Sequence, residues 1–249
     1  MRTVSDFIGH VRAAGLLEVG DRVLVACSGG ADSVALTLLL AKSARRLGLA
    51  SVTLAHMDHA LRRDSREDAA FVEKLGARLG LAVISERHPV VRRRAESPEA
   101  AARRVRYAFL DQAARTTKAD VVVTAHHMDD QAETVLLRIL RGTGPRGLAG
   151  IRPARPLRRG SKIRLVRPLL PFRRVALRGW LERWHQTWRE DPTNVAGNVR
   201  ARLRNRAMPV LAECGGRDPV PLLARLAANS LRPQRKRPSA GEPAKGRKT

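Results

Sequence analysis

The fold of this chain is decided by one stretch, Val23-Leu24-Val25-Ala26-Cys27-Ser28-Gly29-Gly30-Ala31-Asp32-Ser33. Its apolar start is typical of a buried β-strand, and the apolar spacing that follows predicts a helix over Asp32–Arg46. Ser28–Ser33 therefore form a strand-to-helix turn. Free backbone N–H groups and the helix dipole at such a turn bind phosphate, and glycines let the backbone approach closely. Asp32 cannot bind phosphate directly, so we expect a cation between the two, most simply Mg²⁺.

The stretch opens a regular alternation of apolar runs and helical patterns. The expected strands are Val23–Ala26, Val52–Ala55, Ala82–Ser85 and Val121–Ala125. The expected helices are Asp32–Arg46, Ser65–Leu79, Pro98–Arg115 and Asp130–Arg141, with Ser97 as the cap of the third. Alternation at this spacing is typical of βαβ units, and strands that are apolar throughout fit a sheet covered on both faces. The pattern predicts an α/β fold with a doubly wound parallel sheet.

The composition of the sequence changes after Gly142. Residues 142–171 are rich in Gly, Pro and Arg and predict a loop or hairpin. A small helical C-terminal segment is expected from about Phe172 to Ala228, interrupted at Asp191–Asn194. The last residues are basic and almost free of apolar side chains, which is typical of disorder. The predicted units are a nucleotide-binding domain at 1–150, a loop plus helical segment at 151–230 and a basic tail at 231–249.

The charge of the chain indicates a polyanionic partner. Lys and Arg number 48 against 23 Asp and Glu, which gives a net charge of +25 and a pI of about 11.7. Such an excess, most of it arginine, is typical of nucleic-acid binding. Two simpler explanations remain. A genome of high GC content encodes arginine often, and a basic surface can serve only to keep a protein well solvated.

The remaining composition narrows the class of protein. Cys27 and Cys214 form neither a disulfide framework nor a Cys-x-x-Cys metal site, and the histidines lack zinc-ligand spacing. The N-terminus lacks a hydrophobic signal region, and no apolar run reaches the ~20 residues of a membrane span. We therefore expect a soluble, cytoplasmic protein. Its oligomeric state is left open, with a homodimer as one option. Trp180, Trp184 and Trp188 recur every four residues, which predicts a helical stripe packed in the core.

The string Ser28–Ser33 is neither a Walker A loop, which ends in Gly-Lys-Ser/Thr, nor the Gly-x-Gly-x-x-Gly of a dinucleotide site. A Ser-Gly-Gly turn taken alone is more often a flexible helix cap. At its place in a βα unit, the whole string resembles the PP-loop of the ATP pyrophosphatases. That resemblance implies an adenine nucleotide alpha hydrolase-like fold. It also implies that the loop holds pyrophosphate while ATP adenylates a carbonyl or carboxyl oxygen.

Further motifs narrow the resemblance. In chain order they are His56–Arg62 with Asp64-Ser65, Glu99–Arg103 with Arg106-Tyr107, Thr124–Thr134, Arg141–Gly144 with Gly147-Leu148, Arg167–Leu170, Glu190–Asn194 and Arg200–Leu211. Together they resemble the tRNA(Ile)-lysidine synthetase family over about residues 20–212. The resemblance implies that ATP adenylates the C2 carbonyl oxygen of the wobble cytidine in the CAU-anticodon isoleucine tRNA. The amine of L-lysine then attacks C2 and displaces AMP, which forms lysidine.

Candidate roles follow from the chemistry and the resemblance together. Asp32 and Asp130 follow strands, at the edge where open α/β sheets bind ligands, and are the candidate catalytic carboxylates and Mg²⁺ ligands. Glu133 shares a helical face with Asp130 and is the third catalytic candidate. The candidates for ATP binding are Ser28, Gly29, Gly30, Ala31, Asp32, Ser33 and His56. The candidates for tRNA binding are Arg103, Arg106, Arg138, Arg141, Arg200 and Arg204. The structural alternatives are helix capping for the aspartates and a solvated helix face for the arginines.

Two other functions remain open at this point. A cytidine thiolase on tRNA belongs to the same superfamily, but such enzymes generally need cysteines for an iron–sulfur cluster or a persulfide relay. A noncatalytic RNA-binding protein on this scaffold would need neither the intact loop nor Asp130. Many members of the family continue into further C-terminal domains that grip tRNA. The basic tail at 231–249 is therefore expected to give non-specific affinity for tRNA.

Overall fold

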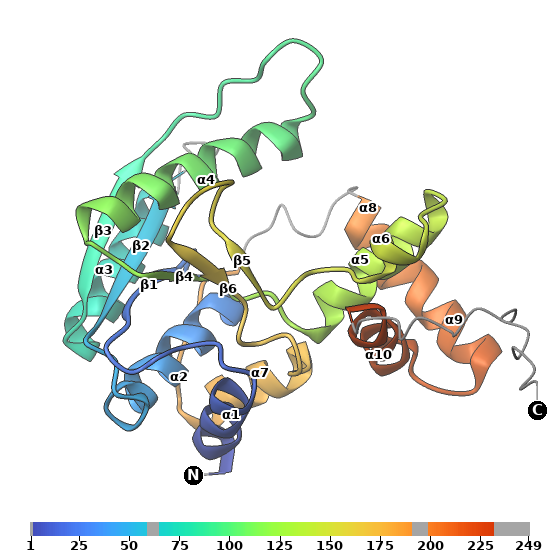
Figure 1. The fold of residues 1–249 in the computed structure, drawn as a ribbon, viewed down its shortest axis with the longest axis horizontal. Helices are drawn as coiled ribbons and strands as arrows, with labels where there is room; N and C mark the ends of the chain where they lie inside the picture. The colour runs from blue at the N-terminus through green and yellow to red at the C-terminus, as the bar shows by residue number, and fades with distance from the viewer. Residues whose placement is uncertain (1, 59–64, 191–198, 232–249) are drawn as a thin grey trace, which may run out of the picture.

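The computed structural model describes residues 2–58, 65–190 and 199–231, and it centres on a six-stranded sheet (Figure 1). The strands are β1 (Arg22–Ala26), β2 (Ser51–Asp58), β3 (Ala82–Arg87), β4 (Val121–Val123), β5 (Ala154–Pro156) and β6 (Arg164–Val166). Their order across the sheet is β3-β2-β1-β4-β6-β5. β5 runs antiparallel to β6, and the other pairings are parallel. The predicted α/β fold is confirmed, with one antiparallel strand at the edge.

Helices cover both faces of this sheet. The helices on one face are α1 (Arg2–Ala13), α2 (Ala31–Leu47), α3 (Ser65–Leu79) and α7 (Arg174–Arg183), and α4 (Pro98–Thr116) lies on the other (Figure 1). In β1, Val23 and Val25 belong to the apolar core of the first face, whereas Leu24 belongs to that of the second. Successive side chains of a strand point to opposite faces, so β1 is apolar throughout because both of its faces are buried.

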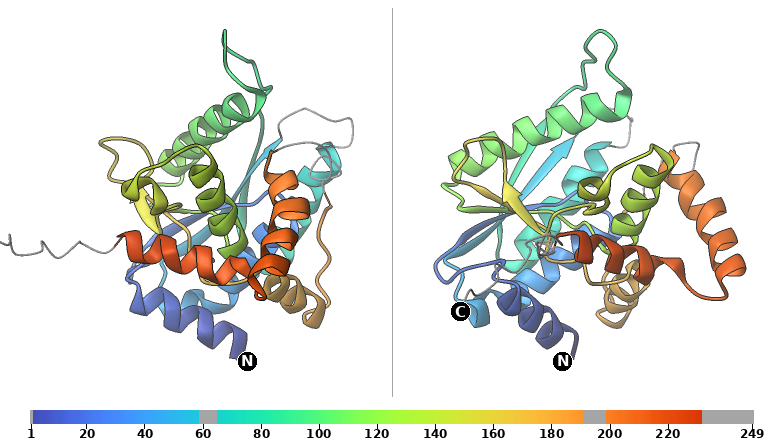
Figure 2. Two further views of the ribbon diagram at one scale, coloured as in Figure 1. Left: turned by 90° about the vertical axis from the view of Figure 1, so that its right-hand side faces the viewer. Right: turned by 45° about the vertical axis from the view of Figure 1, so that its right-hand side comes forward.

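The other helices form a separate cluster beside the sheet, as Figure 1 and the right view of Figure 2 show. They are α5 (Met128–Leu140), α6 (Pro145–Leu148), α8 (Val199–Arg202), a π-helical turn (Leu203–Ala207), α9 (Met208–Gly215) and α10 (Pro219–Leu231). A small apolar core of Ala132, Met208 and Val220 joins α5, α9 and α10. Because α5 follows β4, its first turn lies at the carboxyl edge of the sheet while its remainder enters this cluster.

Most of the predicted elements are present at their predicted places. The hydroxyl of Ser97 caps α4 by accepting a hydrogen bond from the backbone N–H of Ala100 at 3.2 Å, as expected. The hairpin expected in residues 142–171 is formed by β5 and β6. However, β6 also pairs with β4 and extends the parallel sheet, which the Gly- and Pro-rich composition did not indicate. The amphipathic helix α1 was not among the predicted elements.

Trp180, Trp184 and Trp188 pack against the core of the first face, which confirms the predicted packing. The predicted helical stripe is wrong, because α7 ends at Arg183 and His185 takes a positive φ of 49°. The expected interruption at 191–194, residues 59–64 of the second motif and all but the first residue of the tail lie outside the described residues. The division at 1–150 and 151–230 stays a prediction, and β6 on its far side belongs to the sheet. No helix among the residues described is long and apolar enough to span a membrane.

Asp120 ties the start of β1 to the start of β4. Its carboxylate accepts hydrogen bonds from the backbone N–H of Arg22 at 3.0 Å and from the guanidinium at 2.9 Å. The hydrogen bonds from Arg22 lower the pKa of Asp120 to about 2. Because this folded-state pKa lies below the unfolded value, the contact stabilises the fold above about pH 4. That contribution is lost as the pH falls toward about 2.

We therefore expect Asp120→Asn to lower the free energy of unfolding at pH 7 by no more than about 1 kcal/mol, since the pair is half-exposed and screened by solvent. Urea titrations of the variant and the parent across pH 2–7 check this. The difference between the two proteins should shrink as the pH falls from about 4 to about 2. A difference that stays constant down to pH 2 would contradict the assignment.

Candidate active site

The loop from Ser28 to Ser33 joins β1 to α2 at the carboxyl edge of the sheet. Gly29 has a φ of +84°, a left-handed conformation that favours glycine. The hydroxyl of Ser33 accepts from the backbone N–H of Ser28 at 3.2 Å and donates to the carbonyl of Gly30 at 2.9 Å. Gly30 caps α2 without a side-chain hydrogen bond. The first N–H groups of α2 therefore remain available to an anion.

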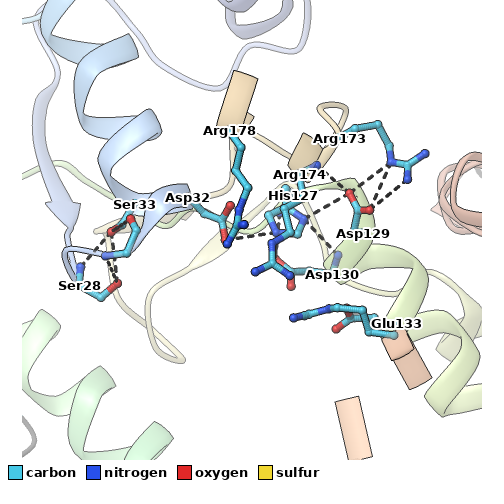
Figure 3. A network of polar contacts seen from close by, with 12 residues as sticks. Ser28, Asp32, Ser33, His127, Asp129, Asp130, Glu133, Arg173, Arg174 and Arg178 are labelled. Carbon is cyan, nitrogen blue, oxygen red and sulfur yellow. Dashed lines mark hydrogen bonds and ion pairs between the residues drawn. The ribbon is translucent and has the colours of Figure 1, made fainter. Parts of the chain in front are cut away.

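His127 links this loop to the first turn of α5, and its side chain is only 1% exposed. Its Nε2 lies 3.4 Å from Asp32 Oδ2 and 3.6 Å from Asp130 Oδ2 (Figure 3). The ring Nδ1 accepts a hydrogen bond from the backbone N–H of Asp130 at 3.3 Å. The backbone N–H of His127 donates in turn to Asp130 Oδ2 at 3.1 Å. These two bonds close a capping box, and Nε2 of the ring faces the carboxylates of Asp32 and Asp130. Asp32 and Asp130, predicted to lie together, thus share one imidazole.

The charges of this group keep Asp32 ionised. Burial raises the pKa of Asp32, but the hydrogen bond and charge of His127, together with the charge of Arg174, outweigh burial, and the pKa lies below its ordinary value. Burial lowers the pKa of His127, yet Asp32, Asp130 and Asp129 outweigh it and hold that pKa above its ordinary value. One oxygen of Asp32, Oδ1, is buried and has no hydrogen-bond partner among the residues that the structure describes. At neutral pH Asp32 is therefore a carboxylate with one oxygen available to a cation.

Glu133 lies one turn further along α5, and its side chain is 2% exposed. Its Oε1 accepts a hydrogen bond from Arg204 Nε at 2.7 Å, and its Oε2 lies 3.7 Å from Arg200 Nη1. Burial lowers the pKa of Arg204, but the hydrogen bond to Glu133 outweighs burial and raises it. Two arginines predicted to bind tRNA therefore contact the third predicted catalytic carboxylate. These contacts link α5 to α8, which contains Arg200, and to the π-helical turn, which contains Arg204.

A cavity of about 180 Å³ lies in front of the loop. Its lining comes from the loop itself, from Arg174 and Arg178 of α7, and from Asp68, Arg189 and Glu190. The backbone N–H of Arg189 donates to the carbonyl of Gly29 at 3.0 Å, and its guanidinium pairs with Asp68 at 2.8 Å. The segment that contains Arg189 is thereby fastened against the loop, and the cavity combines anion-binding N–H groups with three guanidiniums.

A second group of positive side chains lies between α4 and the β5–β6 hairpin. The guanidiniums of Arg103, Arg106 and Arg155 lie over the ring of Tyr107, and that of Arg167 lies beside the same side chain. Burial and these neighbouring guanidiniums lower the pKa of His126 to about 3, so His126 is neutral. Burial likewise lowers the pKa of Arg167, whose side chain is almost fully enclosed. Arg103 and Arg106, singled out from the sequence, thus belong to a larger cationic group with Arg155 and Arg167.

The remaining predicted residues have varied surroundings. His56 Nδ1 lies 3.0 Å from the carbonyl oxygen of Cys27, and its Nε2 is buried without a hydrogen-bond partner in the described part of the chain. Arg138 donates to the carbonyl oxygen of Gly150 at 3.0 Å and so stabilises the turn after α6. Arg141 is exposed at the end of α5. The roles of these residues in binding ATP or tRNA stay predictions.

Sequence reasoning missed Arg174, Arg178 and Arg189 as parts of the loop cavity. Arg174 and Arg178 are four residues apart, so their spacing on a helix was visible. No local pattern indicates that α7 packs against α2, which is the contact that brings them to the loop. The contact of His127 with both Asp32 and Asp130 likewise emerges only from the structure.

We expect Gly29→Ala to destabilise the loop, because a Cβ at a φ of +84° costs about 1–2 kcal/mol. Gly30→Ala is the matched control, since Gly30 has a φ of −72° and an added Cβ would meet its nearest atom at an ordinary 3.5 Å. Urea unfolding of both variants checks the prediction. Equal losses in the two variants would show that the left-handed conformation of Gly29 is not what matters.

The chain is similar to a known protein family and to curated proteins over most of its length. A family model described as a PP-loop domain matches residues 5–211. A relative named tRNA(Ile)-lysidine synthase, from Thermus thermophilus, is 46% identical over 177 residues, which are 70% of this chain and 32% of the relative. Another of the same name, from Salinispora tropica, is 42% identical over 219 residues, which are 85% of this chain and 63% of the relative. The chain therefore spans less than two thirds of the length of these curated relatives.

Among solved structures, a U34-tRNA thiolase from Methanococcus maripaludis superposes with a TM-score of 0.74. The superposition covers 91% of this chain and 78% of that one, at 14% sequence identity. At this identity the likeness concerns the fold, and it agrees with the mostly parallel sheet and its covering helices.

Proposed function

The chain belongs to the PP-loop domain family, and from this premise we propose that it ligates lysine to C2 of the wobble cytidine in the CAU-anticodon isoleucine tRNA. ATP drives the reaction through an adenylated tRNA, and AMP and pyrophosphate are released. The substrates and the adenylated intermediate, like the cytoplasmic location expected from the sequence, are parts of this proposal. The names of the curated relatives support it.

The observation that carries the proposal is the meeting of Asp32 and Asp130 through His127, directly beside an anion-binding loop. Adenylation needs a site for the triphosphate and acidic groups next to it. A protein that only bound RNA would need neither a second carboxylate at this place nor a cavity in front of the loop. The two cysteines also differ in their surroundings, since Cys27 is buried and Cys214 exposed, which gives no support to a thiolase.

The proposed reaction has two steps. In the first, the C2 carbonyl oxygen of the cytidine bonds to the α-phosphorus of ATP. The bond from that phosphorus to the α,β-bridging oxygen breaks, and its electron pair leaves with pyrophosphate. In the second, the lysine amine bonds to C2, the C2–oxygen bond breaks and AMP leaves. Asp130, 21% exposed and beside the cavity loop, is the group that takes up the proton released by the amine.

The side chains of the site fit the Mg²⁺ that accompanies ATP. The buried, unpartnered Oδ1 of Asp32 is a hard oxygen ligand, and Asp130 is the second candidate. Within the described ranges, no group of three or more His, Cys, Asp or Glu side chains is arranged as a metal site. Mg²⁺ usually takes one or two protein carboxylates and completes its shell with phosphate and water. When bound, the ion would neutralise phosphate charge.

The cationic group around Tyr107 is the best-placed surface for the tRNA backbone. It contains the predicted Arg103 and Arg106, and its guanidiniums lie close together with little acidic compensation. Such a group attracts phosphate, and its contribution to affinity should fall as salt rises. The net charge of +25 supports the same partner.

Pyrophosphate release from Mg²⁺-ATP, with the CAU-anticodon isoleucine tRNA and with or without radiolabelled lysine, tests the proposal. We expect pyrophosphate and label in the tRNA, and no label in the same tRNA with guanosine at the wobble position. Pyrophosphate without label would mean adenylation followed by a different nucleophile. Binding of the tRNA without either signal would favour the noncatalytic RNA-binding protein.

A further inference from the structure

The cavity in front of the loop has a second source of positive charge besides the N–H groups of α2. Arg174 and Arg178 are one helical turn apart on α7, and both line this cavity together with the loop. Figure 3 shows Arg178 extending from α7 toward Asp32, with Arg174 beside His127. Two guanidiniums on one helical face therefore meet the loop from outside the βα unit that contains it.

The helix that presents these arginines is held rigidly. Leu177, Trp180 and Leu181 are buried in the core of the first face, where α7 packs against α2. The start of α7 is fixed as well, because Asp129 Oδ2 accepts from the backbone N–H of Arg174 at 2.8 Å. A helix anchored at its start and along its buried face holds its exposed side chains in place, as a binding site requires.

The two guanidiniums have few direct ion pairs within the described part of the protein, although Asp32, which lines the same cavity, feels the charge of both. Arg174 has no side-chain ion pair there, and Arg178 pairs only with Glu190, at 3.2 Å, whose side chain is 67% exposed. The Nε of Arg178 is buried and without a hydrogen-bond partner among the same residues. A buried donor without a partner is costly unless a ligand or water supplies one. The neighbouring Arg173 differs, because it pairs with both Asp129 and Asp218.

We propose that Arg174 and Arg178 bind the β- and γ-phosphates of ATP, and the pyrophosphate formed from them. The ligand follows from the proposed function, on which this inference rests. The planar fork of a guanidinium matches two phosphate oxygens at once. When the bond from the α-phosphorus to the bridging oxygen breaks, negative charge develops on the departing pyrophosphate. The two guanidiniums stabilise that charge, so they act on the chemical step as well as on binding.

The groups that line the cavity have different proposed roles. The loop and the first turn of α2 supply N–H groups, and Asp32 supplies the oxygen for the cation. The arginines of α7 supply guanidinium N–H donors of fixed positive charge. Loss of the α7 arginines should therefore weaken ligands that carry the β- and γ-phosphates and spare ligands that lack them. AMP retains the base, the ribose and the α-phosphate, which makes it the appropriate comparison.

Calorimetric titration of the full chain with Mg²⁺-ATP, Mg²⁺-pyrophosphate and AMP tests the inference. Arg174→Gln and Arg178→Gln should each lower the affinity for ATP and for pyrophosphate on the order of 10- to 100-fold, as expected for a lost charged hydrogen bond. The affinity for AMP should stay within about twofold of the parent's. Arg183→Gln, an exposed arginine at the end of the same helix, should change none of the three. Unfolding midpoints equal to the parent's verify that the variants are folded.

An equal loss of affinity for AMP and for ATP would mean that the arginines maintain the structure of the site and do not contact the β- and γ-phosphates. That result would overturn the inference. So would unchanged affinity for pyrophosphate and ATP. The titrations use neither tRNA nor lysine, so their outcome is separate from that of the lysidine assay. A chain that binds ATP and pyrophosphate as expected yet forms no lysidine would overturn the proposed function alone. A parent chain that binds no ATP would overturn both.

Discussion

Replacing Asp32 by asparagine is expected to lower the rate of pyrophosphate release by about 10²- to 10³-fold, the size of effect seen when one electrostatic group of an active site is removed. The exchange keeps the volume and the contact with His127 but removes the charge. With the amide oxygen kept toward His127, an NH₂ group takes the place of Oδ1, the carboxylate oxygen that is buried without a partner in the described structure. Because the pKa of Asp32 lies below its ordinary value, this carboxyl group is ionised in the parent at neutral pH. The variant therefore differs from the parent by one negative charge at this position.

The measurement is single-turnover pyrophosphate release with saturating ATP and tRNA. Asp6→Asn, the same exchange at an exposed position of α1, is the matched control and should retain the parent rate. The binding of tRNA by Asp32→Asn should stay close to that of the parent, since the cationic group around Tyr107 is untouched. A variant that keeps more than a tenth of the parent rate would remove Asp32 from the catalytic candidates.

Replacing Arg204 by methionine is expected to lower the free energy of unfolding by about 3 kcal/mol. Removing one partner of a buried ion pair typically costs ~3–5 kcal/mol, because the other charge is left buried and uncompensated. Here the charge left behind is Glu133, with a side chain 2% exposed. We expect a value near the lower limit, because the side chain of Arg204 is 34% exposed and Arg200 remains 3.7 Å from the same carboxylate.

The double variant Arg204→Met with Glu133→Met should recover most of this loss, because an apolar pair of similar volume often replaces a buried ion pair without cost. Arg206→Met, an exposed position on the same helix, should leave stability unchanged. Urea unfolding measures all three. If Arg204→Met left stability unchanged but reduced the slope of tRNA affinity against salt by about one, Arg204 would be a phosphate contact, as the sequence predicted.

The region from β1 to α2 could be predicted in detail because its signals are local. A short apolar run, two glycines and a helical apolar pattern lie within about 25 consecutive residues, and each has a direct conformational meaning. The left-handed Gly29 and the free N–H groups of α2 follow from the same residues. The placement of Asp32 near Asp130 was also predictable. Both follow parallel strands, and the carboxyl ends of parallel strands share one edge of the sheet.

Other features depended on contacts between distant segments. The short strand β6 follows a Gly- and Pro-rich stretch, and only its pairing with β4 makes it part of the parallel sheet. The prediction that the three tryptophans form a stripe on one helix was wrong, because α7 ends at Arg183. Their packing against the core was predicted correctly. In both cases tertiary packing outweighed the local pattern.

The site divides in the same way. The residue order alone predicts the loop, the candidate carboxylates and an excess of positive charge that indicates a polyanionic partner. The tertiary structure alone decides that α7 brings Arg174 and Arg178 to the loop cavity, and that Arg204 faces Glu133. The reason is physical. Backbone conformation and hydrophobic periodicity act over a few neighbouring residues, whereas the partner of a charged side chain is set by how helices far apart in the chain pack together.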